Sequence, residues 1–353
     1  MSVIPLINIA ALFAGPSAAR DQADAALAHA AFEIGFMTVR GQPPELRAND
    51  ADRRLLLRLF EIPPSRQRSL WKRNFAAENR HLYRGWFPLS SSIAGNREGF
   101  ELGPDILRPL TTDGTDDVLC EPTPLPSPQL VPDNWLVTAK AYFAAMESIG
   151  FQILDSLSRS LGIDVRIFRD AFQDGISTLR LLHYPAPEQT HQSTENDPGR
   201  FIEIAGKAVE QTTRPHVDSG LLTVLAQCGV GGLQAADHQG NWLDVPVHDD
   251  GFVVNFGGLM ELWTGGRIKA TRHRVLSRGQ ERFSVPFFFE PRPSTRIAPL
   301  PGSPPTAAAF APFLYGDHLW ALTTRFPENF GLEALRPPRE PASLATVPKL
   351  SIG

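Results

Sequence analysis

The stretch Pro215-His216-Val217-Asp218-Ser219-Gly220 places an imidazole and a carboxylate two residues apart. In an extended strand, side chains at positions i and i+2 point to the same face, so His216 and Asp218 are expected to face one cavity. A second imidazole, His273, lies in the extended-looking segment 269–275. Two histidines and one carboxylate with open coordination positions form the ligand set that suits non-haem Fe(II) oxygenases.

A second pair of polar side chains follows this segment. Arg282 and Ser284 also share one face of a strand and come nine residues after His273. A guanidinium fork and a hydroxyl aimed into an apolar pocket suit a carboxylate. A lone His-x-Asp pair is more often a surface turn with a hydrogen-bonded histidine. The third ligand, the Arg-x-Ser pair and the flanking aromatic strands together favour an iron site.

The composition is that of a globular protein with an ordinary core. Of the 353 residues 42% are hydrophobic, and the net charge of -4 shows no nucleic-acid-binding footprint. Cys120 and Cys228 are the only cysteines, which argues against a disulfide framework and favours a reducing cytoplasm. Residues 3–14 lack a positive region before them, so we expect a first strand at 4–9 rather than a signal sequence. No stretch is long and apolar enough to span a membrane.

Hydrophobic periodicity predicts an α+β protein. Helical patterns cover residues 18–34, with Ser17 as N-cap, and residues 51–60; the longest runs from Asp133 as N-cap to a stop at Gly162. Six short strands are expected after residue 176, at 177–184, 221–226, 242–247, 252–256, 268–276 and 282–289. Strands at this spacing favour a sandwich or barrel built as a jelly roll.

The chain divides into three regions that we expect to form one compact unit. Residues 1–175 are helices and strands that pack on the core, residues 176–295 are the jelly-roll core, and residues 296–353 hold a helix at 317–325 and a loose tail at 336–347. Residues 103–132 are expected to form an ordered loop.

Two features of the core region leave questions open. Pro286 within the last strand predicts a sheet edge or a bulge there. Residues 186–213 are polar and irregular, which is compatible both with a lid and with a surface insertion; residues 201–209 within them are expected to form a short helix or a hairpin.

Beyond these patterns, the chain resembles the isopenicillin N synthase-like family of 2-oxoglutarate- and Fe(II)-dependent oxygenases nearly from end to end. The most specific similarity contains the motifs His216-Val217-Asp218-Ser219-Gly220-Leu221-Leu222-Thr223, Gly231-Gly232-Leu233-Gln234, Val254-Asn255-Phe256-Gly257, His273-Arg274-Val275 and Arg282-Phe283-Ser284-Val285-Pro286-Phe287-Phe288. Residues 4–9, residues 30–39 and Arg84-Gly85-Trp86-Phe87-Pro88-Leu89 also resemble family segments.

The resemblance implies a double-stranded β-helix (jelly roll) core with N-terminal and flanking helices. It implies that Fe(II) is held by His216, Asp218 and His273. It also implies that the distal carboxylate of 2-oxoglutarate is bound by Arg282, Ser284 and Tyr184. O2 is the other cosubstrate, and a small molecule would be hydroxylated, or else desaturated or cyclised, with release of succinate and CO2.

The chain departs from the family pattern at three positions. Leu182 stands where many plant members have an asparagine, so that contact with the oxoacid is missing or replaced. Gly258 and Asn8 each replace a frequent aspartate that is not a metal ligand, so these departures bear on structure.

Substrate contacts follow only from analogous places in the family. The candidates are Tyr83, Arg84, Phe87, Phe288 and Arg325. Each has a structural alternative of equal weight: the aromatic side chains could pack into a minor core, and Arg325 could cap the last helix. The expected partner is a small molecule, with neither nucleic acid nor membrane, and the oligomeric state stays open.

Three other functions are compatible with the same residues. An oxidase of the isopenicillin N synthase type keeps the triad and the Arg-x-Ser pair but needs no 2-oxoglutarate. An ethylene-forming enzyme is suggested by a faint similarity in the segment Tyr315-Gly316-Asp317-His318. A binding protein on an inactive oxygenase fold is the alternative outside catalysis.

Overall fold

A computed structural model of the protein describes residues 3–89, 97–109, 117–186, 199–302 and 310–340. The predictions for residues 110–116, 187–198 and 341–347 lie outside the described residues. The α-helices are α1 (Ala18–Glu33), α2 (Asp50–Leu57), α3 (Pro64–Gln67), α4 (Trp135–Leu161), α5 (Arg166–Phe172), α6 (Gly258–Trp263) and α7 (Tyr315–Thr323). Within the described residues, no helix is both long enough and apolar enough to cross a bilayer.

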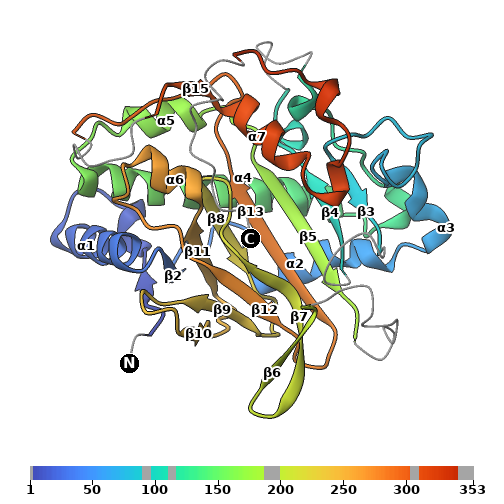
Figure 1. Ribbon diagram of the computed structural model, residues 1–353, viewed down its shortest axis with the longest axis horizontal. Helices are drawn as coiled ribbons and strands as arrows, with labels where there is room; N and C mark the ends of the chain where they lie inside the picture. The colour runs from blue at the N-terminus through green and yellow to red at the C-terminus, as the bar shows by residue number, and fades with distance from the viewer. Residues whose placement is uncertain (1–2, 90–96, 110–116, 187–198, 303–309, 341–353) are drawn as a thin grey trace.

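The strands form two larger sheets and one short pair. They are β1 (Leu6–Asn8), β2 (Phe36–Arg40), β3 (Gly85–Phe87), β4 (Glu98–Leu102), β5 (Thr178–Tyr184), β6 (Phe201–Ile204), β7 (Lys207–His216), β8 (Leu222–Ala226), β9 (Leu233–Ala236), β10 (Trp242–Asp244), β11 (Gly251–Phe256), β12 (His273–Leu276), β13 (Arg282–Phe289), β14 (Arg296–Ile297) and β15 (Phe313–Leu314). The larger sheet has the order β1-β2-β11-β8-β13-β5-β4-β3, and the smaller has the order β10-β9-β12-β7-β6 (Figure 1).

This arrangement confirms the predicted α+β fold with a jelly-roll core and flanking helices. All pairings in the two sheets are antiparallel except that of β1 with β2. The strands of the first 175 residues, β1 to β4, extend the larger sheet at both edges. The jelly roll is therefore built with strands from outside the region that carries the sequence motifs.

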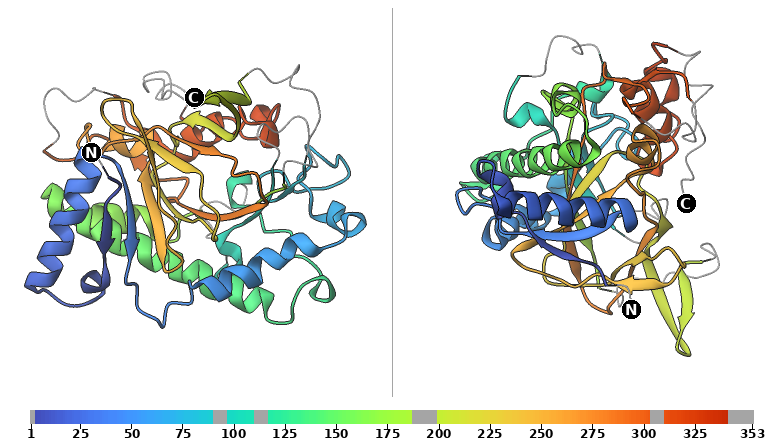
Figure 2. Two further views of the ribbon diagram at one scale, coloured as in Figure 1. Left: turned by 90° about the horizontal axis from the view of Figure 1, so that it is seen from below. Right: turned by 90° about the vertical axis from the view of Figure 1, so that its left-hand side faces the viewer.

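Helix α4 supports the larger sheet from behind. It lies across one face of that sheet with α1 beside it (Figure 2) and ends at Gly162 in the left-handed conformation, as predicted. It begins after Asn134 rather than Asp133. The ring of Phe143 meets Phe287 of β13 edge-on, with centroids 5.0 Å apart. Burying an aromatic side chain of this size stabilises the fold by roughly 1.5–3 kcal/mol.

The predicted strand at 268–276 is wrong in its first half, because only β12 pairs in the sheet. The chain before β12 instead lies against the end of α1, where the N–H of Lys269 donates to the carbonyl of Ala31 at 2.9 Å. Gly35, at φ 70°, makes this approach possible, since a Cβ there would lie 2.1 Å from the carbonyl oxygen of Lys269. The N-terminal helix therefore fixes the path of the chain that leads into His273.

Pro286 lies neither at an edge nor at a bulge, so that prediction is wrong. Strand β13 is central, between β8 and β5. Its pairing with β8 is continuous through Pro286, whereas its pairing with β5 skips Val285 and Pro286 and then resumes in the same register. The missing N–H of proline is thus accommodated by an interrupted ladder on one side of the strand.

Residues 201–209 belong to a hairpin, one of the two forms that we expected. Strands β6 and β7 pair across the turn Ala205-Gly206, in which both residues have positive φ, as a two-residue hairpin turn of type I′ requires. The hairpin projects from the lower end of the molecule in Figure 1. Strand β7 continues from it directly into His216, so this segment is structurally continuous with the iron motif.

We expect Gly150→Ala to destabilise the protein by about 1–3 kcal/mol, because overpacking a well-filled core has this cost. A Cβ at Gly150 of α4 would lie 2.6 Å from the ring of Phe289, which is fully buried and contacts Phe172 and Phe151. The free energy of unfolding in denaturant measures the effect. Gly15→Ala is the control, since no atom lies within 4 Å of a Cβ there. Equal stability of the two variants would contradict the packing argument.

Candidate active site

Alternating side chains of three neighbouring strands form the floor of a cavity of about 460 Å³ between the two sheets. On β13 these are Arg282, Ser284, Pro286, Phe288 and the following Glu290; on β5 they are Thr178, Arg180, Leu182 and Tyr184; on β4 they are Glu101 and the preceding Arg97. The strand register pairs Arg282 with Tyr184, and Phe288 with Thr178. We call the end at Tyr184 and Arg282 the anchor end, and the end at Thr178 and Glu290 the far end.

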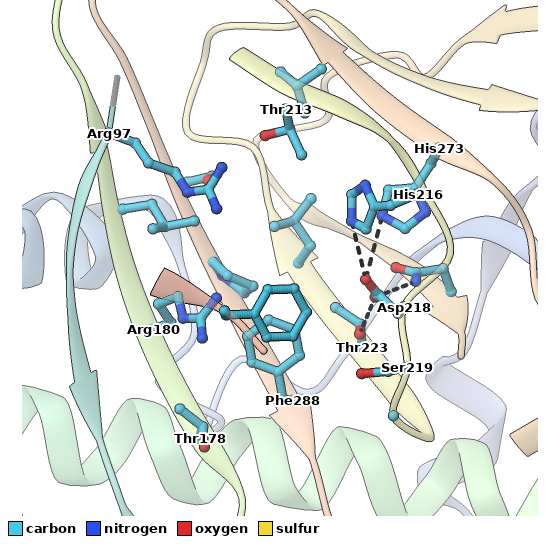
Figure 3. Close-up of a pocket in the computed structure, with 18 of the residues that line it drawn as sticks. Arg97, Thr178, Arg180, Thr213, His216, Asp218, Ser219, Thr223, His273 and Phe288 are labelled. Carbon is cyan, nitrogen blue, oxygen red and sulfur yellow. Dashed lines mark hydrogen bonds and ion pairs between the residues drawn. The ribbon is translucent and has the colours of Figure 1, made fainter. Parts of the chain in front are cut away.

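Three side chains with nitrogen or oxygen donors converge on one wall of the cavity (Figure 3). His216 at the end of β7 is opposite His273 at the start of β12, so the two imidazoles are cross-strand neighbours with ring centroids 4.2 Å apart. Oδ1 of Asp218 lies 3.4 Å from Nε2 of His216 and 3.6 Å from Nε2 of His273. One donor atom of each residue lies within 4.8 Å of the others, as one metal ion requires.

Hydrogen bonds from outside the trio orient all three donors. Nδ1 of His216 lies 2.8 Å from the carbonyl oxygen of Arg214, and Nδ1 of His273 lies 3.0 Å from that of Thr271. Each Nδ1–H therefore donates to a carbonyl, and each Nε2 keeps its lone pair for a metal. Oδ2 of Asp218 accepts hydrogen bonds from Thr223 and Asn255, both at 2.7 Å, which leaves Oδ1 facing the imidazoles.

The electrostatics of the trio favour an ionised Asp218 and a neutral His273. Burial opposes a charge on His216, but the neighbouring Asp218 raises the pKa of that imidazole. Burial alone would raise the pKa of Asp218, but His273, His216 and the hydrogen bond from Asn255 lower it well below its usual range. Burial and the charge of His216 lower the pKa of His273 to about 4. An ionised carboxylate and a neutral imidazole are the forms that bind a divalent metal, so Asp218 and His273 are already in the ligand form, and a bound metal would displace the proton of His216.

The anchor end holds a buried cation, the guanidinium of Arg282. Arg282 and Ser284 are 4% and 1% exposed, and Nη1 of Arg282 donates to Oγ of Ser284 at 3.3 Å. The guanidinium stacks over the ring of Tyr184, 5.0 Å from its centroid. Within the described part of the chain, no carboxylate lies within ion-pair distance of Arg282, and its Nε has no hydrogen-bond partner. A buried guanidinium in this state is suited to an incoming carboxylate.

The five substrate candidates occupy different places. Tyr83 and Phe288 line the cavity. Arg84 lies behind it, where its guanidinium donates to the carbonyl of Ile176 at 2.7 Å and stacks over the ring of Tyr83 at 4.6 Å. Phe87 is fully buried in a small cluster outside the lining, and Arg325 is exposed and outside it.

Several charged side chains of the cavity were missed by sequence reasoning. Nε of Arg180 donates to Oε1 of Glu101 at 2.8 Å, and Lys72 lies 2.5 Å from Oε2 of the same carboxylate. Burial opposes ionisation, but Lys72 and Arg180 lower the pKa of Glu101 to about 2. Arg180 lies four residues before Tyr184 on the same expected strand, so the alternation of that strand predicts that both side chains point to the same face. Lys72 and Glu101 lie in segments that show no hydrophobic periodicity in the sequence.

Comparisons with known proteins agree with this geometry. The model of the 2OG-Fe(II) oxygenase superfamily matches residues 176–291. A 2-oxoglutarate-Fe(II) type oxidoreductase of Aspergillus fumigatus is 26% identical over 295 residues, 82% of each chain. The 2-oxoglutarate-dependent dioxygenase traH of Penicillium crustosum is 27% identical over 273 residues, 74% of this chain and 75% of that one. A full-length Neurospora crassa protein solved in complex with alpha-KG has the same fold, with a TM-score of 0.75 at 21% identity over 92% of this chain and 96% of that chain.

The relatives do not favour the alternatives of an oxidase without 2-oxoglutarate, an ethylene-forming enzyme or an inactive binding protein. His216, Asp218 and His273 form a potential metal-binding group in the lining of the cavity. Residues 176–291 therefore form a 2OG-Fe(II) oxygenase domain, and the protein is a dioxygenase that uses Fe(II), 2-oxoglutarate and O2.

Proposed function

We propose that His216, Asp218 and His273 hold the Fe(II) of this dioxygenase. We further propose that the distal carboxylate of 2-oxoglutarate binds Arg282, Ser284 and Tyr184. The observation that carries both assignments is that three oriented metal donors and a buried guanidinium, which has no carboxylate partner among the described residues, open into one cavity. The reaction is the oxidation of a small molecule, foremost its hydroxylation, with release of succinate and CO2; desaturation and cyclisation are the other outcomes of the same chemistry.

The bound iron supplies the activation of O2 for oxidation of a C–H bond. The protein contributes binding and orientation. The carbonyls behind His216 and His273 hold the imidazole planes, and Thr223 and Asn255 hold Asp218, so the donor set is pre-arranged. Apolar side chains in the lining, among them Leu182, exclude water from the reacting atoms.

The apolar part of the substrate lies between the metal donors and the far end of the cavity. Figure 3 places Phe288 and Arg180 across the cavity from His216 and His273. The guanidinium of Arg180 lies over the ring of Phe288, 4.9 Å from its centroid, and Glu101 holds it there. We propose that Phe288 and Tyr83 contact the substrate directly. Arg84 supports Tyr83 from behind, Phe87 packs behind the wall, and no contact is assigned to Arg325.

We also propose that residues 1–175, 176–295 and 296–353 act as one compact unit. This is supported by the hydrogen bonding of β1 to β4 into the larger sheet and by Leu319 and Thr323 of α7, which line the cavity. Both cysteines are free, which supports a reducing cytoplasmic setting. The partner that the cavity supports is a small molecule rather than nucleic acid or a membrane.

The ligand assignments predict that iron binding and 2-oxoglutarate binding can be weakened separately. Anaerobic titration with Fe(II) and 2-oxoglutarate should produce a weak visible charge-transfer band in the wild type. Asp218→Ala should lose iron binding. Arg282→Ala should keep iron but need about 10- to 100-fold more 2-oxoglutarate, because one buried carboxylate loses a charged partner. Arg278→Ala is the control, since Arg278 pairs with Asp244 on the surface.

Each other result points to a different error. Iron binding without the band would favour the oxidase alternative. A wild type that binds no iron would remove the ligand assignment itself. A band that needs no more oxoacid in Arg282→Ala than in the control would move the carboxylate site elsewhere.

Glu290 gives the far end a group that titrates near neutral pH. It is 7% exposed, and Oγ1 of Thr178 lies 3.5 Å from its Oε2. Burial raises the pKa of Glu290 to about 7, against the opposing charges of Arg84 and Arg180. The acid is therefore protonated in the folded protein at pH values where it is ionised in the unfolded chain.

We expect this acid to make stability fall as pH rises. Its contribution is complete below 4.5, the ordinary value for Glu, and is lost as pH rises through about 7. Between pH 4.5 and 8, the free energy of unfolding of the wild type relative to Glu290→Gln should fall by about 2–3 kcal/mol. Glu203→Gln, at an exposed position, is the control. A pH-independent difference would mean that Glu290 is ionised throughout.

A further inference from the structure

Arg97 is a cation of the anchor end that no assignment above uses. It directly precedes β4, lines the cavity and points into it in Figure 3. The register of β4 with β5 pairs Glu98 with His183, so Arg97 stands opposite Tyr184, which in turn is paired with Arg282. Two arginines therefore flank Tyr184 on neighbouring strands, and the charges of both lower the pKa of its hydroxyl against the effect of burial.

Of the other cations of the cavity, Arg282 is assigned to 2-oxoglutarate, and the rest are engaged within the protein. Lys72 and Arg180 share the carboxylate of Glu101. Arg214 is exposed and engaged in an interaction of its own. Within the described residues, by contrast, Arg97 takes part in no ion pair and no hydrogen bond. A partly buried guanidinium with unused donors favours an anion as its partner.

2-Oxoglutarate does not supply that anion in the assignment proposed above. Its distal carboxylate is matched by Arg282, and its other carboxylate would be taken up by the Fe(II) that His216, Asp218 and His273 would hold. Asp218 neutralises one of the two positive charges of Fe(II). The remaining charge and that of Arg282 together balance the two negative charges of 2-oxoglutarate. The positive charge of Arg97 is then not balanced by 2-oxoglutarate, so we expect the substrate to neutralise it.

We propose that Arg97 binds a carboxylate of the substrate, so that the enzyme oxidises a small carboxylic acid. This inference rests on the proposed function, because it takes the Arg282 site as occupied by 2-oxoglutarate. Arg97 and the metal donors lie on opposite sides of the cavity in Figure 3. A substrate held by its carboxylate at Arg97 therefore extends across the cavity toward the metal, with its apolar part against Phe288. A single guanidinium matches one carboxylate in charge and in geometry.

Two probes of matched shape, one charged and one neutral, test this on the reconstituted enzyme. The protein is loaded anaerobically with Fe(II) and 2-oxoglutarate, and binding of phenylacetate and phenylacetamide is measured by calorimetry in the wild type, Arg97→Gln and Arg97→Lys. The wild type should bind the acid about tenfold or more tightly than the amide. Arg97→Gln should abolish that preference, and Arg97→Lys should keep part of it, since it keeps the charge without the fork.

The charge-transfer band of the same samples distinguishes the two sources of carboxylate. Under the proposal, Arg97→Gln forms the band at nearly the same 2-oxoglutarate concentration as the wild type. If Arg97→Gln needs far more 2-oxoglutarate, Arg97 belongs to the oxoacid site and the proposal is overturned. It is equally overturned if the wild type shows no preference for the acid, or if the preference survives in Arg97→Gln. Absence of the band in the wild type would instead count against the proposed function.

Discussion

The alternation of side chains along β13 is the constraint on which the site depends. Every second residue from Arg282 to Glu290 lines the cavity, while Val285, Phe287 and Phe289 between them are fully buried on the other face, where α4 packs. A slip of one residue in register would exchange the two sets, with the charged side chains in the core and the phenylalanines in the cavity. Core packing against α4 therefore fixes the position of the carboxylate anchor.

The metal donors depend on a second pairing, that of β7 with β12, and on contacts from remote parts of the chain. The segment before His273 is held at the end of α1, where Gly35 allows the backbone at Lys269 to approach closely. Asn255, which holds Asp218, comes from β11 and so from the larger sheet. Displacement of either sheet would misalign the donors, which makes the donor geometry a property of the whole fold.

The parts of the protein that local patterns encode were predictable from the sequence. The period of two identified the strand of Arg282 and Ser284, and the period of about 3.6 identified α4 and its end at Gly162. The triad was recognisable because His216 and Asp218 are close in sequence and His273 follows in a family motif. The prediction for Pro286 was wrong because a central strand tolerates proline when the neighbouring strand does not need its missing N–H. Which neighbour that is depends on the order of strands in the sheet. Arg97 and Glu101 could not be placed, since the register of β4 with β5 alone brings them to the cavity.

The charges of the cavity are divided between two ends with different properties. Toward the far end, Lys72 and Arg180 are both tied to Glu101, and transfer of either to a ligand would leave a buried carboxylate partly unpaired. These cations therefore act as framework, and Arg180 presents the face of its guanidinium to Phe288 rather than a free charge. At the anchor end Arg282 has no carboxylate within the described residues. Ligand charge is thus directed to the anchor end, and the far end accepts apolar or neutral atoms, because Lys72 and Arg180 are already paired with Glu101 and burial favours the neutral form of Glu290.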